Sequence, residues 1–181
     1  IFQCTCPSTE LMNQLKAKKI FSPGKLFFLP DPIINIKEFI SKLKFQENLI
    51  NNLPKKKFFI SVGRLTKQKN FEYLINEFSK FCETNNNFDL LIFGEGEEKE
   101  KLKELINEKK MSKKIFLKGY SKNIFFFMKK AEVFILSSLW EDPGFVLIEA
   151  ALCNLFIISS DCKNGPSEFL LNGNAGILFK S

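Results

Sequence analysis

The sequence contains no histidine, which excludes a mechanism on this chain that needs a histidine base or a histidine metal ligand. Arginine occurs once among 27 basic residues, and there are one tryptophan and two tyrosines. Nucleic-acid interfaces generally use arginine, for its planar fork and its stacking. The net charge of +7 therefore comes from lysine, and the abundance of lysine, phenylalanine and asparagine is typical of an A/T-rich genome. We interpret the basic stretch from Lys101 to Lys130 as a solvated face and expect no nucleic-acid partner.

Long apolar runs and a disulfide framework are also absent. No stretch reaches the roughly 18 apolar residues that a membrane span requires, and no signal peptide opens the chain. The cysteines are odd in number and widely spread: Cys4, Cys6, Cys82, Cys153 and Cys162. This distribution favours reduced thiols in a cytoplasmic protein, and ordinary packing explains Cys4-x-Cys6 better than a special role.

The remaining composition is that of a folded domain. Hydrophobic residues make up 45% of the chain, and 181 residues suit one domain, or one domain and the edge of a second. Strands are predicted at 57–62, 89–93, 115–117, 133–136 and 156–159, and helices at 70–82, 98–109, 123–130 and 144–152. Apolar strands separated by helices predict a doubly wound, Rossmann-like α/β domain, whose parallel sheet is covered by helices on both faces.

The first 50 residues are less regular. A strand predicted over 1–6 begins abruptly, and a helix over 8–18 is capped by Ser8 or Thr9. Pro30-Asp31-Pro32 then stops both helix and strand, and we interpret it as a linker or hinge. We therefore expect the chain to begin inside a larger protein, with residues 1–32 ending one domain and residues 33–181 forming the next.

The sole arginine, Arg64, follows Gly63 at the end of the first strand of the α/β unit. Ligands bind beyond the carboxyl ends of the strands in open parallel sheets. Together with Lys69, Arg64 would offer a diphosphate one planar fork and one mobile point charge. The alternative is a surface arginine in a basic turn, and this motif taken alone favours that alternative.

Two glycines follow the second strand of this unit, in Gly94-Glu95-Gly96. They indicate either a close approach between backbones or a simple loop, and the loop is the plainer interpretation. The acidic continuation excludes a dinucleotide-binding fingerprint.

The run SSLWEDPGFVLIEAAL predicts a helix that Pro143 and Gly144 open. The helix is apolar nearly all round, which predicts burial, yet Glu149 lies in its middle. An ionised carboxylate in such a place is costly unless it is paired. Its two oxygens suit a vicinal diol such as a ribose. The alternative is a structural ion pair with a lysine.

Glu141 precedes that helix, and the first backbone N–H groups, those of Gly144, Phe145 and Val146, would bind an anion or a sugar hydroxyl. A glycosidase acid/base pair of Glu141 and Glu149 is an alternative interpretation. No Asp-x-Asp occurs among the four aspartates, so a metal site for a sugar nucleotide has no evident ligands.

Five motifs together resemble the C-terminal domain of the family 4 glycosyltransferases, the retaining group with the two-Rossmann GT-B fold. They occur in the family's order between Lys57 and Phe179: VGRLTKQKNFEYLI, LLIFGEGEEKEKL, IFLKGY, SSLWEDPGFVLIEAALCN and SDCKNGPSEFLLNGNAGILF. Glu141 and Glu149 fit the family's E-x7-E signature, which is the most specific of these features.

The resemblance implies a role for each matching residue. Arg64 and Lys69 would bind the donor diphosphate, Glu149 the nucleotide ribose and Glu141 the donor sugar, which makes Arg64, Lys69 and Glu141 the catalytic group. Tyr120 would lie near the nucleobase. The donor-binding residues implied in this way are Gly63, Arg64, Lys69, Gly94, Tyr120, Glu141, Gly144, Phe145, Val146 and Glu149.

The resemblance also implies partners. The donor would be a nucleotide sugar carrying a hexose or an N-acetylhexosamine, and Asp161–Pro166 (DCKNGP) resembles a subgroup that often uses UDP-linked donors. The acceptor would be a glycan or a lipid-linked glycan of a bacterial surface polysaccharide, and no metal or other cofactor is expected.

The family's N-terminal, acceptor-binding domain, with its glycine-rich loop, is not part of this sequence. We therefore expect a fragment that binds the donor but is inactive alone, from a cytoplasmic protein that contacts the inner face of the membrane. The alternative is a nucleotide-sugar-binding module without transferase activity.

Overall fold

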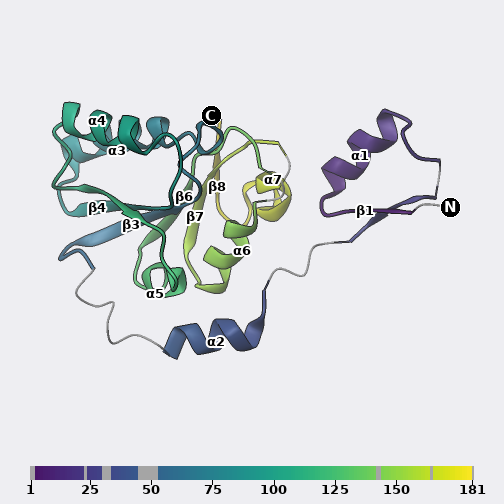
Figure 1. Ribbon diagram of the computed structural model, residues 1–181, viewed down its shortest axis with the longest axis horizontal. Coiled ribbons are helices and arrows are strands. Elements are labelled where there is room, and N and C mark those ends of the chain that lie inside the picture. The colour runs from purple at the N-terminus through teal and green to yellow at the C-terminus, as the bar shows by residue number, and fades with distance from the viewer. Residues whose placement is uncertain are drawn as a thin grey trace.

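The computed structural model describes residues 3–22, 24–29, 34–44, 53–141, 144–163 and 165–180. Its centre is a parallel sheet in the order β5-β4-β3-β6-β7-β8 (Figure 1). The strands are β3 (Lys57–Val62), β4 (Phe88–Phe93), β5 (Ile115–Gly119), β6 (Val133–Leu136), β7 (Phe156–Ser160) and β8 (Ile177–Phe179). The chain leaves the sheet centre in one direction through β3, β4 and β5 and in the other through β6, β7 and β8. This order confirms the predicted doubly wound α/β fold.

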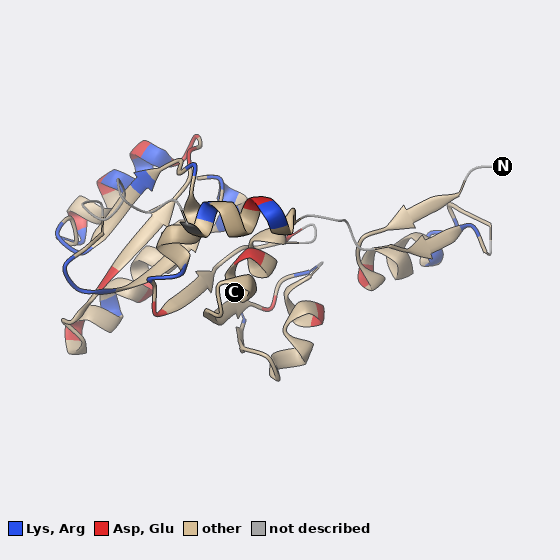
Figure 2. Ribbon diagram, turned by 90° about the horizontal axis from the view of Figure 1, so that it is seen from below, with Lys and Arg blue, Asp and Glu red and all other residues tan. Residues whose placement is uncertain are grey.

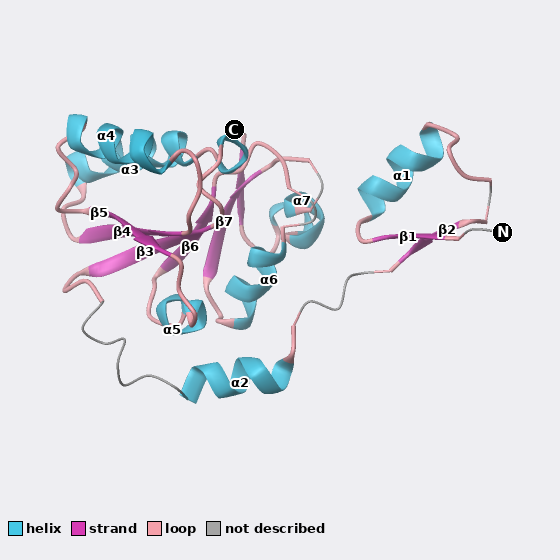
Figure 3. Ribbon diagram, viewed as in Figure 1, coloured by secondary structure: helices cyan, strands magenta, loops and turns pink. Residues whose placement is uncertain are grey.

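Helices cover both faces of the sheet (Figure 3). One layer holds α3 (Phe71–Thr84) and α4 (Lys99–Glu108), and the other holds α5 (Ile124–Met128) and α6 (Phe145–Leu152). Successive side chains of a strand point to opposite faces. In β4, Leu90 and Ile92 accordingly pack with α3 and α4, whereas Leu91 and Phe93 pack with α5 and α6. Burial on both faces explains why the strands are apolar throughout.

Helix α6 differs from its prediction in two respects. Gly144 is its N-cap, with a left-handed φ of 83°, so the helix begins at Phe145; Pro143 lies outside the described residues. Within α6, Leu147 and Ala150 are buried and the other side chains are partly or fully exposed. A helix that covers a sheet contacts it on one side only. The apolar composition of α6 therefore predicted more burial than the structure shows.

Helix α2 (Ile36–Lys44) and strand β8 are among the elements that were not predicted. Helix α2 packs on α5, where the ring of Phe39 meets the ring of Phe125 edge-on at a centroid distance of 4.9 Å. Strand β8 closes one edge of the sheet with three residues, too few to give a periodicity signal. Two short helical turns, η2 (Lys67–Lys69) and η3 (Leu171–Gly173), and helix α7 (Pro166–Phe169) complete this part of the chain.

The N-terminal segment is a small parallel sheet beside the larger one (Figure 1). It consists of β1 (Cys4–Cys6), α1 (Thr9–Ala17) and β2 (Leu26–Phe28). The hydroxyl of Ser8 accepts a hydrogen bond from the backbone N–H of Leu11, which confirms the predicted cap.

Two sequence-based predictions here reach beyond the described residues. The predicted first strand is confirmed over Cys4–Cys6, whereas Ile1 and Phe2 lie outside that part of the chain. The hinge at Pro30-Asp31-Pro32 lies outside it too, so the domain boundary at residue 32 stays a prediction.

The charged surface agrees with the interpretation of 101–130 as solvated. Along the helices of one layer, basic and acidic side chains are interspersed (Figure 2). Lys101 pairs with Glu72 at 2.6 Å and Lys103 with Glu100 at 2.7 Å, and all four side chains are exposed to solvent. None of the helices in the described part of the chain is long and apolar enough to cross a membrane.

All five cysteines are free, as the sequence predicted. Burial raises the pKa of the Cys153 thiol to about 11, which keeps it protonated and unreactive at neutral pH.

Candidate functional site

The strand order reverses between β3 and β6, which are neighbours in the centre of the sheet. Open α/β sheets bind ligands outside the carboxyl ends of the strands at such a switch point. Gly63 follows β3 at this edge, and Ser137 follows β6. These two positions define where a ligand is expected.

A cavity of about 450 Å³ lies beside Gly63, and this volume is within the usual range for small-molecule sites. Its walls come from the ends of β3 and β4, the loop after β5, and the helices α2, α5 and α6. Five of the predicted site residues line it: Gly63, Arg64, Gly94, Tyr120 and Glu149. The structure thus gathers residues that are as much as 86 positions apart in the sequence.

Glycines bring the loops after β3 and β4 into direct contact. Gly94 has a φ of 143°, and a Cβ atom there would lie 1.8 Å from the carbonyl oxygen of Gly63. The N–H of Gly63 in turn donates to the carbonyl of Phe93 at 3.0 Å. Of the two interpretations of the Gly94 motif, the close backbone approach is therefore confirmed.

Arg64 lies on the wall of the cavity with its side chain exposed. In the described part of the chain it forms no ion pair, so its guanidinium group is available to an anion. A free arginine fork beside a concave surface suits a phosphate or diphosphate.

Glu149 contributes a half-buried carboxylate to the same cavity. Burial raises the pKa of this carboxyl, and the positive charge of Lys42 opposes that shift. Among the described residues Glu149 accepts no hydrogen bond and forms no ion pair, so the structural ion pair considered above is not found there. Partly buried polar groups normally have a partner, and an unpartnered one on a cavity wall indicates a ligand.

Lys69 and Glu141 form a buried ion pair beside the cavity. The Lys69 Nζ atom lies 2.5 Å from Oε1 of Glu141, and the two side chains are 12% and 4% exposed. The hydroxyl of Ser138 donates to the same carboxylate oxygen. A Cβ atom on Gly63 would be 3.1 Å from Cε of Lys69, so the lysine side chain lies across the glycine. Arg64 therefore lines the cavity, whereas Lys69 and Glu141 do not line it and pair with each other beside Gly63.

Further hydrogen bonds join the loop after β6 to η2. Ser137 Oγ donates to the carbonyl of Lys69 at 2.8 Å, and the N–H of Leu139 donates to the carbonyl of Gln68 at 2.8 Å. The side-chain amide of Gln68 donates to the carbonyl of Trp140 at 2.9 Å. These contacts fix the backbone around the ion pair. The sequence analysis missed Gln68 and the serines, although polar residues at the end of an apolar strand signal such a role.

Glu141 also lies against the start of α6, as predicted. A Cβ atom on Gly144 would be 3.3 Å from Cγ of Glu141, and no side chain caps this helix. Gly144, Phe145 and Val146 carry the first backbone N–H groups of the helix, which have no partner within the helix itself. The side chain of Val146 packs against the core, so any contribution of this residue to a ligand comes from its backbone.

Several cavity residues were absent from the predicted set: Lys42, Val62, Phe93, Glu95, Ser121, Lys122, Ile124 and Phe125. Lys42 was missed because α2 was missed. Its signal was the helical spacing of Ile36, Phe39, Ile40 and Leu43.

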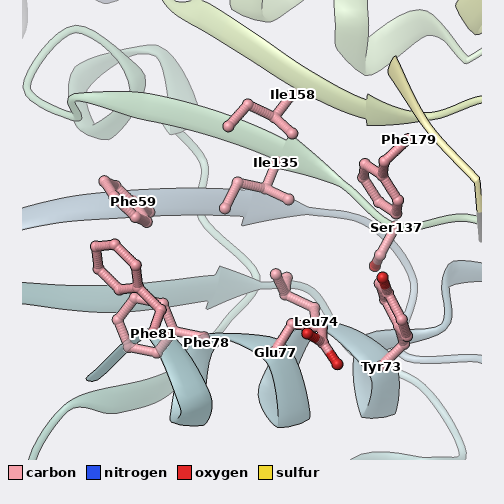
Figure 4. A pocket seen from close by; sticks show the side chains of 10 residues that line it. All are labelled: Phe59, Tyr73, Leu74, Glu77, Phe78, Phe81, Ile135, Ser137, Ile158 and Phe179. Atoms are coloured by element: carbon pink, nitrogen blue, oxygen red, sulfur yellow. The ribbon is translucent and has the colours of Figure 1, made fainter. Parts of the chain in front are cut away.

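A second cavity, of about 350 Å³, lies between α3 and the sheet (Figure 4). Apolar and aromatic side chains dominate its walls. Its one charged lining residue, Glu77, pairs with Lys80 at 2.8 Å. No cation lines this cavity, and it therefore suits an anionic ligand less well than the cavity at the switch point.

Across the residues that the structure describes, no three histidine, cysteine, aspartate or glutamate side chains gather closely enough to hold a metal ion. The expectation that no metal or cofactor is needed stays a prediction.

The family model for glycosyl transferases group 1 matches residues 43–181, which include every cavity residue except Lys42. The chain belongs to this family. An uncharacterized glycosyltransferase of Methanocaldococcus jannaschii is 45% identical over 125 residues, covering 68% of this chain and 31% of the relative.

A second relative is similar over nearly the whole chain. This Campylobacter jejuni protein is an N-acetylgalactosamine-N,N'-diacetylbacillosaminyl-diphospho-undecaprenol 4-alpha-N-acetylgalactosaminyltransferase. It is 30% identical over 203 residues, covering 98% of this chain and 55% of the relative. The chain thus spans 31% and 55% of the length of these two relatives.

Solved glycosyltransferase structures share the fold. Staphylococcus aureus TarM, crystallised with UDP, fondaparinux and alpha-GlcNAc-glycerol, superposes with a TM-score of 0.81 at 21% identity, covering 99% of this chain and 34% of TarM. WaaG, a glycosyltransferase involved in lipopolysaccharide biosynthesis, superposes with a TM-score of 0.81 at 14% identity, covering 98% of this chain and 49% of WaaG. At these identities the likeness establishes the architecture, that of GT-B glycosyltransferases.

Proposed function

We propose that this chain is the donor-binding half of a retaining glycosyltransferase of family 4. It binds a nucleotide sugar, UDP-linked and carrying a hexose or N-acetylhexosamine, for transfer to a glycan or lipid-linked acceptor of a bacterial surface polysaccharide. The observation that carries this proposal is the cavity at the switch point, where an arginine and a carboxylate, neither of them paired within the described residues, face one space. The named activity of the Campylobacter relative and the UDP in the TarM crystal support the choice of donor and acceptor.

Each end of the donor has a matching group. Arg64 binds the diphosphate through its planar fork, and the carboxylate of Glu149 accepts hydrogen bonds from the two ribose hydroxyls. The loop around Tyr120, exposed at the far wall of the cavity, lies beside the base. The cavity volume of about 450 Å³ suits the nucleoside part, and the diphosphate leads from it past Gly63.

The sugar then lies near the Lys69–Glu141 pair. Oε1 of Glu141 is occupied by Lys69 and Ser138, whereas Oε2 has no hydrogen bond within the described ranges and can accept one from a sugar hydroxyl. As the bond from sugar to phosphate breaks, negative charge grows on the leaving diphosphate. Arg64, Lys69 and the backbone N–H groups at the start of α6 stabilise that charge, which lowers the barrier in proportion to how well they are preorganised. By the family resemblance, the leaving diphosphate also helps to deprotonate the acceptor.

The acceptor is held by a part of the full-length protein that precedes this domain. The lengths of the relatives support this, since the chain covers 31% and 55% of the two described above. A lipid-linked acceptor places the reaction at the inner face of the membrane, with the enzyme on the cytoplasmic side.

The test is a titration of the purified chain with UDP, GDP, ADP and their sugars by calorimetry and thermal shift. We expect UDP to bind with a dissociation constant of roughly 0.1–1 mM, because the closure that adds burial needs the acceptor-binding part. The Arg64→Ala/Glu149→Gln double variant is the matched control and should not respond. Failure of every nucleoside diphosphate to bind at millimolar concentration would contradict the proposal.

A second measurement separates a transferase from a binding module. The full-length protein should transfer sugar from a UDP-sugar to a lipid-linked or oligosaccharide acceptor, and the 181-residue chain should not, because positioning of the acceptor supplies roughly 7–11 kcal/mol of the barrier reduction. Turnover by the chain at the full-length rate would contradict the division into halves. Binding without turnover by the full-length protein would favour the binding module.

A further inference from the structure

Helix α2 brings an unassigned cation to the cavity. Lys42 lines the cavity of about 450 Å³ and also a neighbouring one of about 120 Å³. Glu149 is the other charged residue whose side chain lines both. The Glu149 carboxylate therefore lies where the two spaces meet, with Lys42 on their common wall.

The backbone at Lys42 is held firmly against the cavity. The side-chain amide of Asn123 donates to the carbonyl of Lys42 at 2.7 Å, and the side-chain oxygen of the same residue caps α5 by accepting from the N–H of Phe126 at 3.3 Å. The edge-on contact of Phe39 with Phe125 fixes the middle of α2 on the same helix. Because α5 forms part of the cavity wall, these contacts place the backbone of Lys42 beside the cavity.

The ammonium group of Lys42 pairs with a second carboxylate at the protein surface. Its Nζ atom lies 2.7 Å from Oε1 of Glu38, one turn earlier on α2, and 5.9 Å from the centre of the Phe125 ring. Glu38 also lines the smaller cavity. Lys42 thus lies between two carboxylates. It forms an ion pair with Glu38 and acts on Glu149 through space, without direct contact.

The carboxylate of Glu149 depends on the placement of Lys42 in two ways. A direct ion pair with Lys42 would occupy the oxygens that a diol needs, and ligand binding would have to break it. Burial raises the pKa of this carboxyl, and its protonated form donates where two ribose hydroxyls also donate. A lysine held back by Glu38 avoids both outcomes.

We propose that Lys42 is a positioning residue for the ribose-binding carboxylate: held by Glu38, it keeps Glu149 ionised and both of its oxygens free for a vicinal diol. This inference rests on the proposed function, since it assumes that Glu149 binds the donor ribose. Other charged or titratable groups lie around this carboxylate. Arg64 after β3, Glu95 after β4, and Tyr120 and Lys122 after β5 line the same cavity, and Cys153 after α6 interacts with Glu149 through its charge. Of the cations that line the cavity, Lys42 is the one whose charge lowers the pKa of the Glu149 carboxyl.

The first experiment needs no ligand. The Glu149 carboxyl is titrated by carbon-detected NMR in the wild-type chain and in Lys42→Met, which keeps the length of the alkyl side chain. The pKa of Glu149 should rise in Lys42→Met and stay near the wild-type value in Lys42→Arg and in Lys37→Met, a matched control from the exposed side of α2. An unchanged Glu149 pKa in Lys42→Met would overturn the inference.

The second experiment measures the dissociation constants of UDP and dUDP between pH 5 and pH 8 by calorimetry. In Lys42→Met, we expect UDP binding to weaken at the acidic end more than it does in the wild-type chain, with little effect on dUDP. Glu38→Gln releases Lys42 toward Glu149 and should lower the preference for UDP over dUDP at all pH values.

The outcomes separate the two proposals. If Glu149→Gln abolishes the preference for UDP while Lys42→Met leaves both the preference and its pH dependence unchanged, Lys42 has no positioning role and the proposed function stands. If wild-type chain shows no preference for UDP over dUDP, or no binding, the assignment of Glu149 fails and takes this inference with it.

Discussion

The ammonium group of Lys69 lies 2.5 Å from the carboxylate of Glu141, although the two residues are 72 positions apart in the sequence. Lys69 belongs to the short helix after β3, and Glu141 to the loop after β6. The ion pair therefore bridges the two strands between which the sheet order reverses. Because both side chains are largely removed from water, this contact ties the stability of the domain to the geometry of its candidate site.

Removal of one partner of this pair should destabilise the fold. Glu141→Gln leaves the Lys69 charge buried without compensation, a loss that is typically about 3–5 kcal/mol. The Lys69→Met/Glu141→Gln double variant should lose less than the sum of the two single variants, because no uncompensated charge remains. The measurement is urea unfolding followed by circular dichroism.

Lys101 gives the matched control for this pair. It forms an ion pair with Glu72 at a similar distance of 2.6 Å, but its side chain is 56% exposed. Lys101→Met should change the unfolding free energy by less than about 1 kcal/mol. Equal losses in Glu141→Gln and Lys101→Met would show that burial of the Lys69–Glu141 pair has no energetic consequence.

Arg64 should dominate the affinity for the diphosphate. Arg64→Ala should weaken binding of a nucleoside diphosphate by about 1.5–3 kcal/mol, the range for a hydrogen bond to a charged group, as measured by calorimetry. Arg64→Lys should recover part of the loss, because a lysine keeps the charge but not the fork. Lys67→Ala, an exposed cation three residues away, is the control and should bind as wild type does. Wild-type affinity in Arg64→Ala would remove Arg64 from the site.

Most of the sheet could be predicted from the sequence, because burial on both faces makes each central strand a short apolar run. Strand β3, at 57–62, was predicted with its correct bounds in this way. Strand β4 was predicted to begin one residue later than it does. The helix after Asn70 was found because its buried side chains recur at helical spacing. Local composition is sufficient to predict a helix or strand when one or both of its faces pack against the core.

The rest depended on contacts between distant segments. Strand β8 has three residues, and only its pairing with β7 makes it a strand. Gly94 could be interpreted as a loop glycine until the carbonyl of Gly63 was placed against it. Lys69 was expected to join Arg64, but its partner Glu141 lies 72 positions away. The residue types of the site were evident in the sequence, whereas their pairing was not.

Gly94 should tolerate no side chain, because the loops after β3 and β4 touch there. Gly94→Ala would place a Cβ atom 1.8 Å from the carbonyl oxygen of Gly63, so the loop that carries Arg64 must move. Gly173→Ala is the matched control: its φ is also positive, at 93°, but no atom lies within 4 Å of the added Cβ. Gly173→Ala should cost about 1–3 kcal/mol for its backbone conformation alone.

Gly94→Ala should cost more than this and should also weaken UDP binding, whereas Gly173→Ala should leave UDP binding unchanged. Thermal unfolding and calorimetry give the two readouts. Similar losses of stability in both variants, with unchanged UDP affinity, would mean that the contact between the two loops does not shape the site.

The last prediction concerns pH. Burial raises the pKa of the Glu149 carboxyl above its ordinary value of 4.5, against the opposing charge of Lys42. A carboxyl with a raised pKa binds its proton more tightly in the folded state than in the unfolded state. Its contribution to stability is therefore fully present below pH 4.5 and is lost as the pH rises through the raised, folded-state value. The wild-type chain should lose stability across this pH window. The Glu149→Gln variant should lack the share of that loss that comes from the Glu149 carboxyl.

Binding of UDP should change in the opposite direction across the same window, because the ionised carboxylate is the form that accepts both ribose hydroxyls. Urea unfolding and UDP titration at matched pH values test the two trends together. Burial also raises the pKa of Asp89, with the same sign for stability, but that residue is present in both proteins, so the difference between them isolates Glu149. Stability curves for wild type and Glu149→Gln that stay parallel from pH 4 to pH 8, with UDP affinity independent of pH, would contradict both the raised pKa and the role of Glu149 as the ribose acceptor.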